Sequence, residues 1–180
     1  MDIVLYVLLA VLILILAVIF IRTLNFKPVS SATVSGETVN VDQDRAVENL
    51  RELVRCKTVS YRDPSLEDDG EFQKLINKLP TLYPNVFEVC EYNQLPDRAL
   101  LFKWKGKLEG APTVLMAHYD VVPVDEAGWE KPPFEAILEN GIIWGRGTLD
   151  TKVTFGGILL AADTLIAEGF AFHISPSIMN

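Results

Sequence analysis

Residues 114–152 of this 180-residue chain carry three motifs: MAHYDVVPV (116–124), WEKPPF (129–134) and GRGTLDTK (145–152). The first motif ends an apolar, strand-like run with His118 and Asp120, and the third brings Asp150 to the start of a helix-like run. Because side chains two residues apart on a strand lie on the same side, His118 and Asp120 are expected to point the same way. The stretch therefore predicts a backbone that presents a histidine and carboxylates to a ligand.

Helix-like and strand-like segments flank these motifs and together predict an α/β domain. Helical periodicity or cap signals predict a helix that begins at Asp42 or Asp44 and runs to about residue 55, a second from about 70 to Pro80, and a third over 152–168 before Gly169. Apolar, β-branched runs predict strands over residues 86–92, 99–104 and 113–118. Asn140-Gly141 predicts a hairpin between residues 136–139 and 142–144, since both residues tolerate positive φ.

The N-terminus is a candidate membrane segment. Every residue from 3 to 21 is apolar, and such a run reaches roughly 28 Å, close to the thickness of the bilayer core. A cleaved secretory signal is the alternative, because Ser30-Ser31-Ala32 resembles a cleavage site, although Asp2 replaces the usual basic start. We expect a single-pass anchor over residues 1–24, a tether over 25–42 and the α/β domain over 43–180.

The charges near the apolar run bear on its orientation. Arg22 and Lys27 follow the run, which favours a cytoplasmic domain by the positive-inside rule. The net charge of the whole chain is -8, and without a basic cluster there is nothing to attract a phosphate backbone, so nucleic acid is excluded as a partner. Cys56 and Cys90 are far apart and lie in periodic segments, so we expect buried free thiols.

The polar residues at the ends of the apolar runs admit two interpretations. In a zinc site, His118 would bind the metal through one ring nitrogen while Asp120 accepts a hydrogen bond from the other, and Asp150 could bridge two metals. Alternatively, His118 and Asp120 form an ordinary surface pair and Asp150 caps the following helix. Arg146 could bind either an anion or a nearby carboxylate.

The order and spacing of the three motifs resemble the zinc-dependent peptidase M20 family, which includes carboxypeptidase S, aminoacylase and succinyl-diaminopimelate desuccinylase. The resemblance covers roughly residues 44–170, and the anchor and surrounding sequence are most similar to the carboxypeptidase S-like branch. It implies the N-terminal part of a mixed-sheet zinc-exopeptidase catalytic domain.

The family resemblance also implies roles for particular residues. His118 would be a ligand of one zinc ion, Asp120 the carboxylate that orients it, and Asp150 the carboxylate that bridges two zinc ions. Cobalt or manganese could occupy the same ligands. The implied reaction is hydrolysis of an amide bond in a peptide or an N-acyl amino acid, with a glutamate as general base and metal activation of water. A homodimer would form only in a full-length protein.

The chain departs from the family pattern after residue 170. The expected Glu-Glu pair, which supplies the general base and a metal ligand, is absent from the remaining sequence AFHISPSIMN. We interpret these residues as an unpatterned tail produced by truncation or a frameshift, and His173 as solvent-exposed rather than a ligand. The chain is therefore expected to be inactive, with the apolar faces of residues 113–117 and 155–166 partly uncovered. The alternative function is a noncatalytic, membrane-tethered module.

Overall fold

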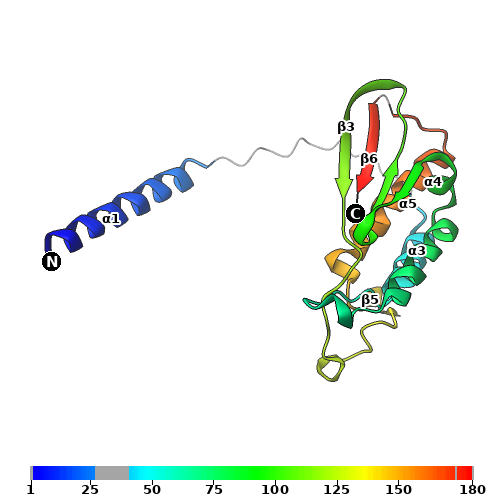
Figure 1. Ribbon diagram of the computed structural model, residues 1–180, viewed down its shortest axis with the longest axis horizontal. Coiled ribbons are helices and arrows are strands. Elements are labelled where there is room, and N and C mark those ends of the chain that lie inside the picture. Colours follow the sequence, from blue (N-terminus) through cyan, green and yellow to red (C-terminus); the bar gives the residue numbers. More distant parts are fainter. Residues whose placement is uncertain (1, 27–40, 173, 180) are drawn as a thin grey trace. The chain divides into compact units, whose positions relative to one another are not determined.

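The computed structural model describes residues 2–26, 41–172 and 174–179, and the chain divides into two units, Met1–Asn40 and Val41–Asn180 (Figure 1). The first unit contains helix α1 (Asp2–Leu24). Its segment Ile3–Leu24 has a mean hydropathy of 3.5 and is long enough to cross a membrane, although a signal sequence has the same features. Most of the expected tether, residues 27–40, lies outside the described residues.

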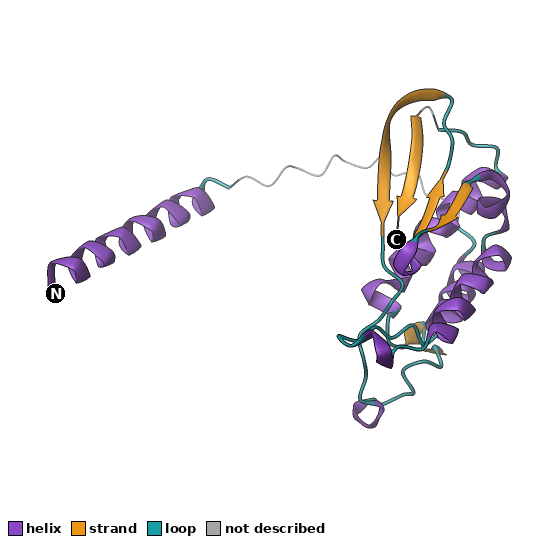
Figure 2. Cartoon of the chain, in the orientation of Figure 1, coloured by secondary structure: helices purple, strands orange, loops and turns teal. Residues whose placement is uncertain are grey.

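The second unit is an α/β domain, as the sequence predicts. Its four α-helices are α2 (Gln43–Val54), α3 (Asp69–Leu82), α4 (Pro84–Val89) and α5 (Val153–Ala167). Its strands are β1 (Glu91–Gln94), β2 (Leu100–Lys103), β3 (Leu108–Met116), β4 (Ile137–Glu139), β5 (Ile142–Trp144) and β6 (Ile174–Met179). Figure 2 shows the helices of this unit on one side of the larger sheet, and α5 contacts both α2 and α4.

The larger sheet is mixed, with the strand order β1-β2-β6-β3. Strands β1 and β2 are antiparallel, β2 and β6 are antiparallel, and β6 and β3 are parallel. Strands β4 and β5 form a separate antiparallel hairpin. Strand β3 ends at Met116, where the first sequence motif begins, so the candidate site lies beyond the C-terminal end of this strand.

Several predicted element boundaries are confirmed because local side chains determine them. Asp42 precedes α2 and accepts a hydrogen bond from the Arg45 backbone N–H at 3.0 Å, as an N-cap does. The β4–β5 hairpin turns at Asn140 and Gly141, whose φ angles are 51° and 77°. Helix α5 is followed by Gly169 with a φ of 75°, the left-handed conformation that commonly ends helices.

The strand predicted over residues 86–92 is wrong in its first part, where the chain forms α4. Pro84 occupies the first helical position, and Asp163 of α5 caps the helix by accepting hydrogen bonds from the backbone N–H groups of Asn85 and Val86 at 2.7 and 3.2 Å. The capping carboxylate is nearly eighty residues away in sequence, so no local pattern reveals it. The predicted end of α3 near Pro80 is also early, since the helix continues to Leu82.

The interpretation of residues 171–180 as an unpatterned tail is wrong, because residues Ile174–Met179 form β6 between β2 and β3. The local sequence does not favour a strand, but hydrogen bonds to a neighbouring strand on each side stabilise one here. Pro176 is unusual inside a central strand, and the register against β3 shifts between Leu108 and Thr113. His173 lies outside the described residues.

The core packs the helices against the sheet. Its largest fully buried side chains include Tyr83, Phe102, Leu53, Leu75, Leu79, Leu100 and Leu159. Cys56 and Cys90 are buried free thiols, as predicted, and burial raises the pKa of Cys90 to about 11.

The expected uncovered apolar surface occurs mainly on β3. Val114, Leu115 and Met116 are 43–69% exposed, whereas Phe155 and Leu159 of α5 are buried. A groove of about 400 Å³ lies between β3 and α5, lined by Leu115, Ile158, Leu165 and Trp104 among others. The prediction is therefore confirmed for the strand and holds in part for the helix, where Ile158, Leu165 and Ile166 are only half-buried.

Asp163 is the carboxylate whose removal should weaken this packing most. It is fully buried, caps α4 and pairs with Arg45 of α2 at 2.6 Å. We expect Asp163→Ala to lower the free energy of unfolding by about 3 kcal/mol, because a buried pair loses one partner and a helix loses its cap. Exposed Glu88 of α4 provides the control, and Glu88→Ala should change it by less than about 0.5 kcal/mol. Urea unfolding in detergent micelles measures both, and equal effects would contradict this role.

Candidate metal centre

The backbone that follows β3 places His118 and Asp120 on the outside and Tyr119 on the inside. Tyr119 is 3% exposed, donates a hydrogen bond from its hydroxyl to the Arg98 carbonyl at 2.6 Å and packs against the rings of Phe72 and Phe155. Burial raises the pKa of Tyr119 to about 12, so its hydroxyl stays protonated. With Tyr119 fixed in the core, the alternation of an extended chain directs its two neighbours outward.

A second segment pairs with this strand end and keeps it extended. Val59, in the segment 58–60 beyond α2, forms a parallel bridge with Val121. Val121 N–H donates to the Thr58 carbonyl at 2.8 Å, Ser60 N–H donates to the Val121 carbonyl at 2.9 Å, and the Thr58 hydroxyl donates to the Tyr119 carbonyl at 2.6 Å. The backbone around His118 is therefore fixed by hydrogen bonds on one side.

Asp150 reaches the same place from the turn Thr148–Lys152, before α5. The turn begins after Gly147, whose φ is 89° and where a Cβ atom would lie 2.6 Å from Val121 Cγ1. Only glycine combines that backbone conformation with such a close approach. Asp150 has extended backbone angles, and the peptide bond that joins it to Thr151 is cis.

The structure brings the three predicted side chains together. His118 Nδ1 lies 3.1 Å from Asp120 Oδ1 and also 3.1 Å from the Asp120 carbonyl oxygen, and His118 Nε2 lies 3.3 Å from Asp150 Oδ1. The imidazole thus has an oxygen acceptor at each ring nitrogen. All three side chains reach solvent, Asp150 most of all with 84% exposure.

The arrangement fits a metal with His118 Nε2 and Asp150 as its ligands. When Nδ1 donates to Asp120, the lone pair of Nε2 is free to bind a metal. Two ligand atoms of a tetrahedral zinc ion are about 3.4 Å apart, given zinc–nitrogen and zinc–oxygen bonds of about 2.1 Å, and the Nε2–Oδ1 separation is close to that value. Within the described residues, however, no group of three or more His, Cys, Asp or Glu side chains could hold a metal.

The structure bears on the alternative roles of Asp150 and Arg146. Asp150 is not an N-cap, because the N-cap position of α5 is Lys152 and no side chain caps it. Arg146 places its guanidinium 5.1 Å from the ring centroid of Trp129, a cation–π contact, and makes no ion pair in the described part of the chain. The Asp150 carboxylate is therefore available for a ligand.

Two residues that support the site were not singled out from the sequence. The Thr151 hydroxyl donates to the His118 carbonyl at 2.8 Å and accepts from the His118 N–H at 3.3 Å, which ties the turn to the strand end. Lys152 is fully buried, and its ammonium donates to two backbone carbonyls. Both belong to the GRGTLDTK motif, so membership of that motif was the only signal for them.

A polar pocket of about 260 Å³ adjoins the imidazole on its Asp120 side. Its lining includes His118, Asp120, Ser60 and Asp97. A water or polar ligand group could therefore reach the hydrogen bond that orients the imidazole.

Comparison with known proteins identifies the family of this chain. Residues 114–175 match the sequence model described as Peptidase family M20/M25/M40. The chain belongs to the M20 peptidase family. It is 33% identical over 129 residues to "Probable carboxypeptidase S-like 2" of Dictyostelium discoideum, an alignment that covers 68% of the chain and 24% of the relative. It is 36% identical over 127 residues to the human "N-fatty-acyl-amino acid synthase/hydrolase PM20D1", with 68% and 25% covered.

This M20-family chain thus spans about a quarter of the length of these curated relatives. Among solved structures, it resembles the M20 family metallo-carboxypeptidase Sso-CP2 from Sulfolobus solfataricus, with a TM-score of 0.60, 21% identity, and 74% of this chain and 30% of the other covered. Human carnosine dipeptidase 1 gives a TM-score of 0.58 at 20% identity, with 76% and 31% covered. These structures share the fold of the α/β unit.

The hydroxyl of Thr151 should have a measurable effect on stability. Thr151→Val preserves the shape of the side chain but removes both hydrogen bonds to His118, so we expect the free energy of unfolding to fall by about 1 kcal/mol. Thr151→Ser keeps the hydroxyl and should lose less, while Thr154→Val, at an exposed position in α5, should change it by less than about 0.5 kcal/mol. Urea unfolding would contradict this assignment if the Thr151→Val and Thr154→Val variants were equally stable.

Proposed function

We propose that this M20-family hydrolase sequence holds a divalent metal ion through His118 and Asp150, with Asp120 as the carboxylate that orients the histidine. The observation that carries the proposal is the position of the imidazole, with Asp120 at Nδ1 and Asp150 at Nε2. Asp150 has a second carboxylate oxygen, which makes it the candidate bridge to a second metal ion. Zinc suits this combination of imidazole and carboxylate, and cobalt or manganese could replace it.

The proposed chemistry is hydrolysis of the amide bond of a peptide or an N-acyl amino acid. Support comes from the relatives, which include a carboxypeptidase S-like protein and an N-fatty-acyl-amino acid synthase/hydrolase. A bound zinc ion would polarise the amide carbonyl and lower the pKa of a water molecule. In this chain, His118 and Asp150 would supply ligand atoms and Asp120 would fix the tautomer of His118. The backbone would hold the two proposed ligands at a fixed separation.

We further propose that the chain as given does not turn over substrate. Catalytic zinc sites use three protein ligands, and the described residues bring two together. Residues 169–180 contain no Glu or Asp, so the Glu-Glu pair that the family resemblance leads us to expect after residue 170 is not in this sequence. Asp120 cannot fill that role while it binds His118 Nδ1.

Metal titration of the full chain in detergent micelles tests this proposal. We expect at most one Zn²⁺ or Co²⁺ per chain, and His118→Ala should weaken binding at least about tenfold because it removes a ligand. The chain has only one other histidine, so His173→Ala is the matched control and should leave the affinity unchanged. N-Acyl amino acids and dipeptides should not be hydrolysed.

Two outcomes would contradict the proposal in different ways. Binding of two metal ions per chain with turnover would overturn the proposed inactivity. If neither wild type nor variants bound metal, the noncatalytic, membrane-tethered module would be the better account.

The N-terminal unit is proposed as an uncleaved membrane anchor, with the anchor over residues 1–24, a tether over 25–42 and the catalytic-domain part over 43–180. The support is the length and hydropathy of Ile3–Leu24. Arg22 at the end of α1 favours a cytoplasmic domain.

Alkaline carbonate extraction of membranes tests the anchor. The full-length chain should stay in the membrane pellet at its uncleaved mass, because a helix of this hydropathy is stable in the bilayer core. A chain that lacks residues 2–24 is the control and should be released. A shortened, soluble product from the complete sequence would show that the segment is a cleaved signal.

A further inference from the structure

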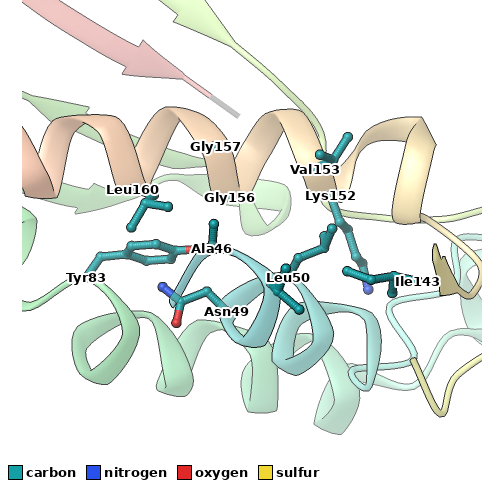
Figure 3. Close-up of a pocket in the computed structure, with 11 residues that line it drawn as sticks. Ala46, Asn49, Leu50, Tyr83, Ile143, Lys152, Val153, Gly156, Gly157 and Leu160 are labelled. Atoms are coloured by element: carbon teal, nitrogen blue, oxygen red, sulfur yellow. The ribbon is translucent and has the colours of Figure 1, made fainter. Parts of the chain in front are cut away.

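Lys152 follows Asp150 by two residues in the candidate metal centre, although its side chain is directed into the core and contacts neither His118 nor Asp150. Its side chain is fully buried, and Nζ donates to the Leu53 carbonyl at 2.9 Å and to the Cys56 carbonyl at 2.7 Å. Figure 3 shows the side chain extending from the start of α5 past Leu50 toward α2, along a pocket of about 190 Å³. The lysine therefore connects the turn that carries Asp150 to the end of another helix.

The end of α2 is a favourable place for this ammonium group. The last carbonyl groups of a helix have no partners within the helix, and the helix dipole makes that end negative. A buried ammonium is costly unless it is hydrogen-bonded, and here two carbonyls of one helix end accept from it. The two bonds fix the position of residue 152, and residue 150 is only two residues away.

The same helix end also controls His118. Residues 58–60 lie a few residues after α2 and hold Tyr119 and Val121 through two backbone hydrogen bonds and one from the Thr58 hydroxyl. Val121 also contacts the Asp150 turn, because Gly147 packs against both Val121 and the aliphatic part of the Lys152 side chain. Both metal-binding residues are thus attached to the C-terminal end of α2 by different routes.

We propose that Lys152 is a positioning residue that sets the separation between His118 and Asp150 by fixing the Asp150 turn to the C-terminal end of α2. The inference rests on the proposed function, since it assigns a purpose to a separation that matters for binding a metal. Lys152 itself supplies no ligand atom and acts only through the backbone.

Lys74 offers a matched control for this role. Its Nζ donates to the Arg55 carbonyl at 3.2 Å, so it too places an ammonium at the end of α2, but from α3 and with 44% of its side chain exposed. Lys152→Met and Lys74→Met each remove one cation from the same helix end. Only the first substitution releases the Asp150 turn.

Amide hydrogen exchange of the full chain in detergent micelles gives a readout that needs no metal. For the amides of residues 121 and 152, we measure the ratio of the exchange rate to that of the Phe102 amide in β2. In Lys152→Met this ratio should be at least tenfold higher than in wild type, whereas Lys74→Met should leave it unchanged. A purely structural role would instead accelerate all three amides together. Co²⁺ titration should show affinity reduced about 10–100-fold in Lys152→Met and by less than about threefold in Lys74→Met.

The outcomes separate the inference from the proposed function. If wild type bound no Co²⁺, the proposed function would fail while the exchange ratios would still decide the role of Lys152. Wild-type ratios in folded Lys152→Met would overturn the inference. If that variant did not fold, Lys152→Gln, which removes the charge but keeps a polar donor, would take its place. Faster exchange at residues 121 and 152 would then support the inference, and unchanged ratios would overturn it.

Discussion

The site depends on one constraint: two segments more than thirty residues apart in sequence must hold His118 and Asp150 within 3.3 Å of each other. Both side chains are substantially exposed, so packing around the side chains does not impose that distance. The backbone does, through the Thr151 hydroxyl on His118, the parallel pairing of residues 58–60 with 119–121, and the two hydrogen bonds of Lys152. The geometry of the proposed metal centre is therefore a property of the scaffold around it.

This arrangement explains how a partial site can be well formed. The contacts that fix His118 and Asp150 come from the end of α2 and the segment after it, the end of β3 and the turn before α5, all within the described residues. Further ligands would have to come from elsewhere, since these elements bring together only the two proposed metal ligands and the carboxylate proposed to orient one of them. Membership of the M20 family identifies the kind of chemistry, and the number of donors determines whether this chain can perform it.

Much of the fold could be predicted because its signals are local. Asp42 before α2, Asn140-Gly141 in the hairpin and Gly169 after α5 each act on their own backbone. His118, Asp120 and Asp150 could be singled out because their motifs have a recognisable spacing. The failures have long-range causes: Asp163 caps α4 from α5, and β6 is stabilised by strands on both sides. Thr151 and Lys152 were missed for the same reason, since their partners are His118 and the end of α2.

X-ray absorption at the zinc edge of the metal-loaded full chain tests the central claim most directly. The account predicts a first shell with one imidazole nitrogen and otherwise oxygen ligands, and loss of the imidazole signal in His118→Ala. Two or more imidazoles, sulfur ligands from Cys56 or Cys90, or an unchanged spectrum in His118→Ala would contradict it.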